Sequence, residues 1–161
     1  MVLRMLKVRE EAEEVAQDTF IKAFESLSNF RGESKFSSWL YRIAYRKALD
    51  RIRANKRQRT SQLIEAITET EIASIEDGLQ YMEQKERTAI IRECILQLPE
   101  TEAAVVTLYY FESQSVKEIA VITELSTDNV KIKLYRSRKT LFSLLKGYVQ
   151  PEITRTNGKA I

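Results

Sequence analysis

Basic and aromatic side chains are mixed within one stretch of the chain. The segment Arg42–Arg59 carries eight Lys or Arg side chains and a single acid, Asp50. Four aromatic residues lie in or just before it: Phe36, Trp39, Tyr41 and Tyr45. Cations pair with phosphates, and a base stacked on an aromatic ring gains about 1–3 kcal/mol. The combination favours a nucleic-acid partner. The alternatives are a solvated helix face for the cations and domain core for Phe36 and Trp39.

A second cationic segment follows a short apolar one near the C-terminus. Residues 115–122 predict a short helix, residues 123–126 a tight connection, and residues 127–146 a long helix. The long helix has apolar residues at Val130, Leu134 and Leu141, and its other side is basic. This order is typical of a helix-turn-helix, whose second helix enters the major groove of DNA. The alternative is an ordinary helical hairpin with a cationic surface.

The residues that most enzymes need are missing from the sequence. Its 161 residues include no His and one Cys, which excludes Ser-His and Cys-His catalysis, His-ligated zinc and an internal disulfide. We therefore expect no catalytic residue, no metal and no cofactor. The longest run without a charge, Ala103–Phe111, is less than half of a membrane span. A cytoplasmic protein without membrane insertion is expected, with Cys94 as a core residue.

The net charge of +3 hides a division along the chain. Residues 1–59 carry 14 Lys and Arg against 8 Asp and Glu, residues 60–104 carry 3 against 10, and residues 105–161 carry 9 against 5. Helical stripes of apolar residues cover 10–27, 35–56, 90–98 and the helix-turn-helix, whereas 60–86 is acidic and weakly periodic, with one short helix around 75–86. We predict an all-α protein of two small helical domains, 1–59 and 89–148, joined by an acidic linker, 60–88, and followed by a tail, 149–161.

Three segments together resemble one family. Ala12–Phe20 is similar to the polymerase-binding motif of bacterial sigma-70 factors, and Phe30–Ala44 is similar to their promoter-melting segment. Residues 98–99 and 115–141 are similar to the region that reads the minus-thirty-five element. The size and order of the segments resemble the small extracytoplasmic-function (ECF) type, with domains like sigma regions 2 and 4.

The resemblance implies a subunit that binds RNA polymerase core, directs promoter-specific initiation and has an anti-sigma factor as a further partner. It implies polymerase contacts by Glu14, Gln17, Asp18 and Ile21. It implies minus-ten contacts by Arg31, Lys35, Phe36, Trp39, Arg42, Arg46, Arg53, Lys56 and Arg57. It implies minus-thirty-five contacts by Lys131, Ile132, Lys133, Tyr135, Arg136 and Arg138.

The sequence departs from the family pattern at three places. Family members usually carry another helix before Glu10, so part of the Phe20/Phe24 stripe is expected to be uncovered. Glu124 stands where the family usually has Gly in the turn, which costs roughly 1 kcal/mol if the residue is left-handed. Ile132 replaces a small or polar residue, which suggests a different promoter preference.

Two other functions compete with the sigma-factor hypothesis. One is a stand-alone helix-turn-helix regulator that binds duplex DNA without polymerase. The other is an inactive interaction protein that titrates an anti-sigma factor. The sigma-factor hypothesis expects two separate cationic modules on a flexible acidic linker, and a single hydrophobic core shared by both halves would count against it.

Overall fold

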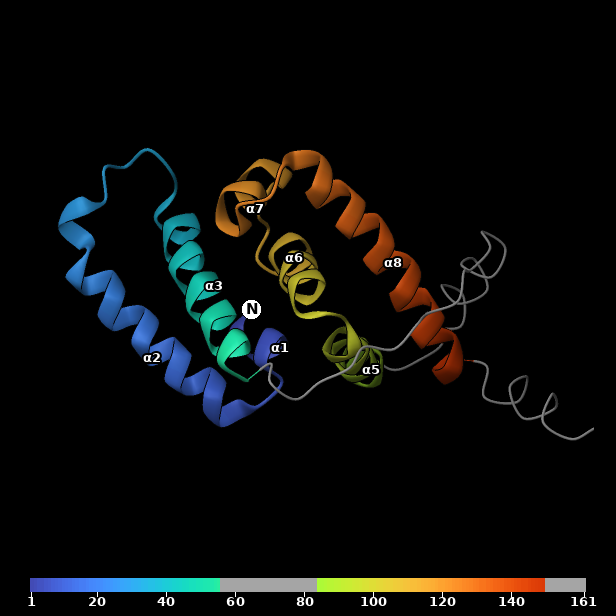
Figure 1. Ribbon diagram of the computed structural model, residues 1–161. Coiled ribbons are helices and arrows are strands. Elements are labelled where there is room, and N and C mark those ends of the chain that lie inside the picture. The colour runs from blue at the N-terminus through green and yellow to red at the C-terminus, as the bar shows by residue number, and fades with distance from the viewer. Residues whose placement is uncertain (56–83, 150–161) are drawn as a thin grey trace, which may run out of the picture. The chain divides into compact units, whose positions relative to one another are not determined.

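The computed structural model describes residues 1–55 and 84–149, and the regular structure in these ranges is helical, with no strand (Figure 1). This confirms the predicted all-α class. The elements are α1 (Val2–Leu6), α2 (Arg9–Glu25), the 3₁₀ turn η1 (Leu27–Asn29), α3 (Phe36–Asn55), α5 (Gln84–Gln97), α6 (Glu100–Tyr110), α7 (Val116–Thr123) and α8 (Thr127–Val149).

The described residues form two compact units that cut across the predicted domains. The first unit contains residues 1–55 together with 99–134, and the second contains 84–98 together with 135–149. The predicted boundaries at 59, 88 and 148 stay a prediction, and residues 56–83 and 150–161 lie outside the described ranges. Most of the short helix expected around 75–86 also lies outside them.

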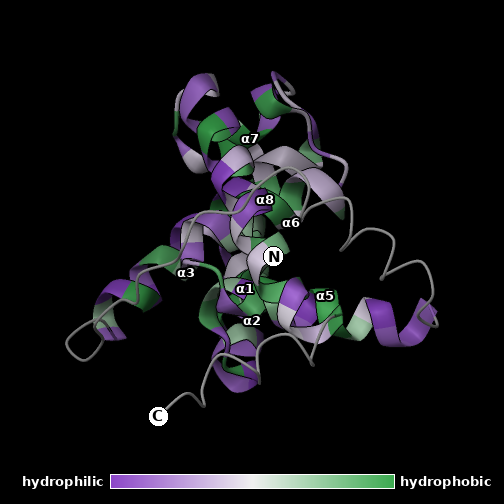
Figure 2. Ribbon diagram, turned by 90° about the vertical axis from the view of Figure 1, so that its right-hand side faces the viewer, coloured by the Kyte–Doolittle hydropathy of each residue, from purple (hydrophilic) through white to green (hydrophobic). Residues whose placement is uncertain are grey.

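One hydrophobic core holds the first unit together, and it differs from the two separate cores expected. Buried residues from the N-terminal segment, such as Met5 and Ala48, belong to the same cluster as Leu108 and Ile119. The reason lies in α6, where every residue from Ala103 to Leu108 is buried. Figure 2 shows hydrophobic colour along this helix. A helix that is buried on all sides needs neighbours on all sides. Helix α1 supplies one of them.

Helix α1 was not predicted as an element, because five residues are too few for a periodic pattern. Met5 and Leu6 are buried in the shared core, and the helix ends at Lys7, which has a φ of 65°. Arg4 ties α1 to the second half of the chain. Its Nη1 donates to Thr107 Oγ1 at 3.1 Å, and its guanidinium lies 3.9 Å from the ring centre of Phe111.

Helices α7 and α8 have the order of a helix-turn-helix, as predicted. Ser115 Oγ accepts from the backbone N–H of Glu118 at 3.3 Å, and the Glu118 carboxylate accepts from the backbone N–H of Ser115 at 2.8 Å. This capping box fixes the start of α7. The helix ends at Glu124, which is left-handed with a φ of 60°. Ser126 then accepts from the backbone N–H of Asn129 and begins α8.

A small apolar cluster forms the core of the second unit. Cys94 of α5 and Leu145 of α8 are buried, and Ile91, Leu141 and Phe142 pack against them. The prediction of Cys94 as a core residue is confirmed. Burial raises the pKa of its thiol from 9.0 to about 11, so the thiol stays protonated at neutral pH.

Candidate nucleic-acid interface

Three aromatic rings form a cluster where the loop 30–35 enters α3. The ring centres of Phe30, Phe36 and Trp39 lie 5.2–5.6 Å from one another. Phe36 is 49% exposed, and the cluster is not part of the buried core. Gly32, with a φ of 72°, allows the loop to turn. The exposed ring of Phe36, with the exposed cations Arg31 and Lys35 in the preceding loop, makes a surface that suits an unstacked base.

The predicted cations of α3 are not all free on the surface. Arg42 Nη2 donates to Glu124 Oε1 at 3.0 Å, and Arg46 donates to the same oxygen. Arg53 pairs with Asp50 one turn away at 3.3 Å. Glu124 lies more than 75 residues from both arginines along the chain, so no local pattern in the sequence predicts these pairs. Lys56 and Arg57 lie outside the described residues.

Lys35 has an acidic partner of the same kind. Its Nζ lies 2.8 Å from Glu118 Oε1. Together with the N-terminal hydrogen bonds from Ser115, this contact lowers the pKa of the Glu118 carboxyl from 4.5 to about 2. Arg46 and then Arg42 lower the pKa of Glu124 in the same direction. Both acids are therefore fully ionised at neutral pH. Their negative charge partly neutralises the positive charge of the predicted minus-ten surface.

Two hydrogen bonds also join α3 to the segment between α6 and α7. Ser38 Oγ donates to Gln114 Oε1 at 2.9 Å, and both residues are buried. Tyr41 donates its phenol to Glu112 Oε2 at 2.6 Å. Desolvation, followed by the bond to Glu112, raises the pKa of Tyr41 to about 12. These contacts hold the chain between α6 and α7 against α3. The sequence pattern predicted only a short loop there.

Helix α8 presents four of the predicted minus-thirty-five residues along one side. Lys131, Ile132, Tyr135 and Arg136 are all exposed, and their spacing of one, three and one residues fits one helical face. Arg138 is exposed as well. Lys133 lies apart from this face, because its Nζ pairs with Glu102 Oε1 of α6 at 2.8 Å and its side chain is only 27% exposed. The structure therefore brings Lys133 to the protein and not to the exposed face.

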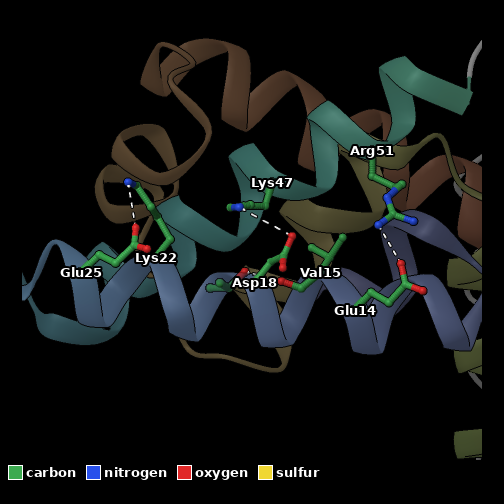
Figure 3. A network of polar contacts seen from close by, with 8 residues as sticks. Glu14, Val15, Asp18, Lys22, Glu25, Lys47 and Arg51 are labelled. Carbon is green, nitrogen blue, oxygen red and sulfur yellow. Dashed lines mark hydrogen bonds and ion pairs between the residues drawn. The ribbon is translucent and has the colours of Figure 1, made fainter.

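Figure 3 shows the predicted polymerase-binding helix α2 beside α3. Glu14 accepts from Arg51 Nη2 at 2.8 Å, and Asp18 lies 3.7 Å from Lys47 Nζ. These two acids of the predicted set are therefore engaged by α3, although both stay more than half exposed. Gln17 and Ile21 are exposed, as expected for a docking face.

An apolar surface continues from Ile21 along α2. Phe20 is 63% exposed and Phe24 is 81% exposed, so the stripe that was expected to be partly uncovered is uncovered. Large exposed rings at this spacing mark a surface suited to a protein partner. Among the described residues, no group of acids or cysteines could hold a metal ion. None of the described helices is long and apolar enough to cross a membrane.

Comparisons with known proteins match both halves of the chain. Residues 1–58 match the model of sigma-70 region 2, and residues 88–141 match that of sigma-70 region 4. The chain is 32% identical over 153 residues to RNA polymerase sigma-H factor of Pseudomonas aeruginosa, which covers 91% of this chain and 79% of the relative. It is 31% identical over 156 residues to ECF RNA polymerase sigma factor SigW of Bacillus subtilis, covering 89% and 80%.

A third relative and a solved structure complete the comparison. ECF RNA polymerase sigma-E factor of Escherichia coli K12 is 32% identical over 148 residues, covering 88% of this chain and 75% of the relative. A solved structure of the sigma factor RpoE with the anti-sigma factor NepR from Bartonella quintana has the same fold, with a TM-score of 0.68 over 90% of this chain and 87% of the other, at 20% identity. The core shared by both halves of the chain contradicts the two separate modules that the sigma-factor hypothesis expected, but the sequence matches do not depend on that expectation. The chain therefore belongs to the sigma-70 family of RNA polymerase sigma factors, within its ECF subfamily.

Proposed function

We propose that this sigma factor binds RNA polymerase core through α2 and directs promoter-specific initiation with two DNA-binding surfaces. The aromatic cluster at the start of α3 holds a base of the opened minus-ten element, and the cations around it hold the strand. The exposed face of α8 reads the minus-thirty-five element in the major groove. The chain is a cytoplasmic binding protein and makes or breaks no bond.

The observation that carries this proposal is the aromatic cluster with its neighbouring cations. Opening a base pair costs a few kcal/mol, and stacking on a ring returns about 1–3 kcal/mol per base. The half-exposed ring of Phe36 is available for such stacking, and Arg31 and Lys35 lie beside it in sequence and are exposed. A major-groove reader needs neither an exposed aromatic cluster nor a second basic element.

Run-off transcription with core polymerase across a promoter library tests the proposal. Phe36→Ala should lower promoter-dependent transcript by about 5- to 100-fold, the equivalent of one stacked base. Tyr110→Ala is a matched control, since Tyr110 is 51% exposed and Phe36 is 49% exposed. Full activity of the Phe36 variant, or an equal loss in both variants, contradicts the role of the cluster.

Core binding by α2 is tested separately. Ile21→Lys places a charge on the exposed apolar surface of α2 without touching the core of the fold, since Ile21 is 59% exposed. It should weaken capture of core polymerase at least tenfold. Val121→Lys, at a residue 50% exposed on α7, should leave capture unchanged. Glu14 and Asp18 are less suitable for this test, because reversing their charge also breaks contacts to α3.

We further propose an anti-sigma factor as a partner of this chain. The structural neighbour RpoE was solved in complex with the anti-sigma factor NepR. Exposed rings on α2, above all Phe24, offer an anti-sigma factor the same apolar surface that polymerase would use. Competition between the two partners for the chain, measured with Phe24→Ser beside the unaltered chain, tests this sharing.

A further inference from the structure

The cations assigned to minus-ten DNA face acids that belong to the helix-turn-helix half of the same chain. Glu124, the residue that ends α7, accepts from Arg42 and from Arg46 of α3. Glu118 of α7 pairs with Lys35 just before α3. Two carboxylates thus occupy the hydrogen-bonding positions that phosphates of a DNA strand would take on three cations.

Glu124 holds this place at a conformational cost. Its φ of 60° and ψ of 26° are left-handed, a backbone region that glycine enters freely and a residue with a side chain disfavours. A glycine would end α7 with less strain, but it would leave Arg42 and Arg46 without their shared carboxylate. The position therefore carries an acid where backbone geometry alone favours glycine.

The ion pairs are accessible enough to be exchanged. The side chains of Arg42, Arg46 and Glu124 are 41%, 53% and 50% exposed, so water and ions reach each pair. Exposed pairs are weak individually and are screened by salt. A polyanion can therefore compete with Glu124 for these cations.

We propose that Glu124, assisted by Glu118, is a built-in competitor of DNA phosphates that lowers the affinity of the free protein for the minus-ten strand. The contact is autoinhibitory, because the Glu124 carboxylate compensates the charge of Arg42 and Arg46 and occupies the Nη2 donor of each, so a phosphate has to compete with it. Promoter DNA presented on polymerase, with many phosphates in place, displaces the acid. The inference rests on the proposed promoter-binding role of Arg42 and Arg46.

The test measures binding of the full chain to a fluorescein-labelled single-stranded DNA of mixed sequence, about 30 nucleotides long, by fluorescence anisotropy over a range of salt concentrations. A single strand is chosen because a helix-turn-helix reads duplex DNA. Glu124→Gln keeps the shape of the side chain and removes its charge. It should bind about three- to tenfold more tightly than the unaltered chain, as expected from the loss of two exposed ion pairs.

The salt dependence gives a second measure. The slope of log affinity against log salt should steepen by about 0.7 for each cation that gains a phosphate. Glu13→Gln is the matched control: it makes the same change of charge in an exposed ion pair with Arg9, one helical turn away within α2. This variant should bind the strand no more than about 1.5-fold more tightly than the unaltered chain.

Removal of the two arginines separates competition from a general charge effect. In a chain that already carries Arg42→Gln and Arg46→Gln, adding Glu124→Gln should change affinity less than 1.5-fold, roughly the effect of the control. Equal affinity and slope for the Glu124 and Glu13 variants would overturn the proposal. So would a gain that persists without the arginines, or no measurable strand binding by any variant at about 50 mM salt. Failure of the proposed function would be seen in other assays, because the unaltered chain would then not capture core polymerase or support run-off transcription.

Discussion

Leu108 provides a direct test of the core that the two halves of the chain share. Leu108 lies on α6, is fully buried and belongs to the same cluster as Tyr45, Ala48 and Ile52 of α3. Leu108→Ala should lower the free energy of unfolding by about 2–5 kcal/mol, the cost of the lost burial and the cavity left behind. With a urea slope of about 2 kcal/mol per molar, the midpoint falls by about 1–2.5 M.

The chain contains a reporter in the other half. Trp39 on α3 is its single tryptophan, and it packs against Phe30 and Phe36. If the core is shared, urea unfolding followed by tryptophan fluorescence and by circular dichroism at 222 nm must move together in the Leu108 variant. Two independent modules would leave the fluorescence midpoint in place while the helical signal shifts.

Two further variants protect this measurement. Val105→Ala removes less volume from the same fully buried region and should lower the free energy of unfolding by roughly 1.5–2.5 kcal/mol. This milder variant replaces Leu108→Ala in the experiment if the Leu108 variant does not fold. Val121→Ala, at a site 50% exposed, should change the midpoint by less than about 0.5 kcal/mol. A fluorescence midpoint unmoved in both core variants would refute the shared core.

Three other predictions follow from single groups. Because burial raises the pKa of Cys94 from 9.0 to about 11, a disulfide reagent at pH 8 should modify the folded chain about a hundredfold more slowly than the unfolded one; equal rates would contradict the burial. Ser115→Ala should lower the free energy of unfolding by about 0.5–2 kcal/mol through loss of the α7 capping box, measured by urea unfolding, and Ser115→Thr should retain most of it. Tyr41 has a folded pKa of about 12 and an unfolded value near 10, so its stabilising contribution is complete below pH 10 and lost as the pH rises to 12. Tyr41→Phe should flatten that part of the stability curve, and an unchanged curve would show that Tyr41 titrates normally.

Helical periodicity carries most of what the sequence predicted about local structure. The apolar stripes place α2, α3, α7 and α8 close to their observed bounds. Apolar residues on the buried face of a helix recur every three to four positions, whichever segment packs against that face. The same pattern does not say which segment supplies the cover. Residues 103–108 of α6 are all buried, and such an uncharged run has no preferred side from which a partner could be deduced.

Long-range polar contacts explain the rest of the difference. Lys133 looks like a DNA-binding residue by its place in a basic helix, yet it pairs with Glu102 of α6, 31 residues away. Glu124 is 82 residues from Arg42. No local pattern links residues at such separations, so the sequence indicates which side chains are charged but not which charges are already paired. The one local signal available was the Ser115–Glu118 spacing of a capping box.

The paired charges change what the basic composition of α3 means for a DNA partner. The sequence suggests a strongly cationic helix, but Lys47 and Arg51 face the acids of α2, and Arg42 and Arg46 share Glu124. A polyanion approaching free α3 therefore meets cations whose charge is largely compensated within about 4 Å. A phosphate that takes the same donor replaces a carboxylate contact, so its net gain is the small difference between two ion pairs. Under the proposed function, specific affinity comes mainly from the aromatic cluster and from α8, and α3 adds to it when the acids are displaced.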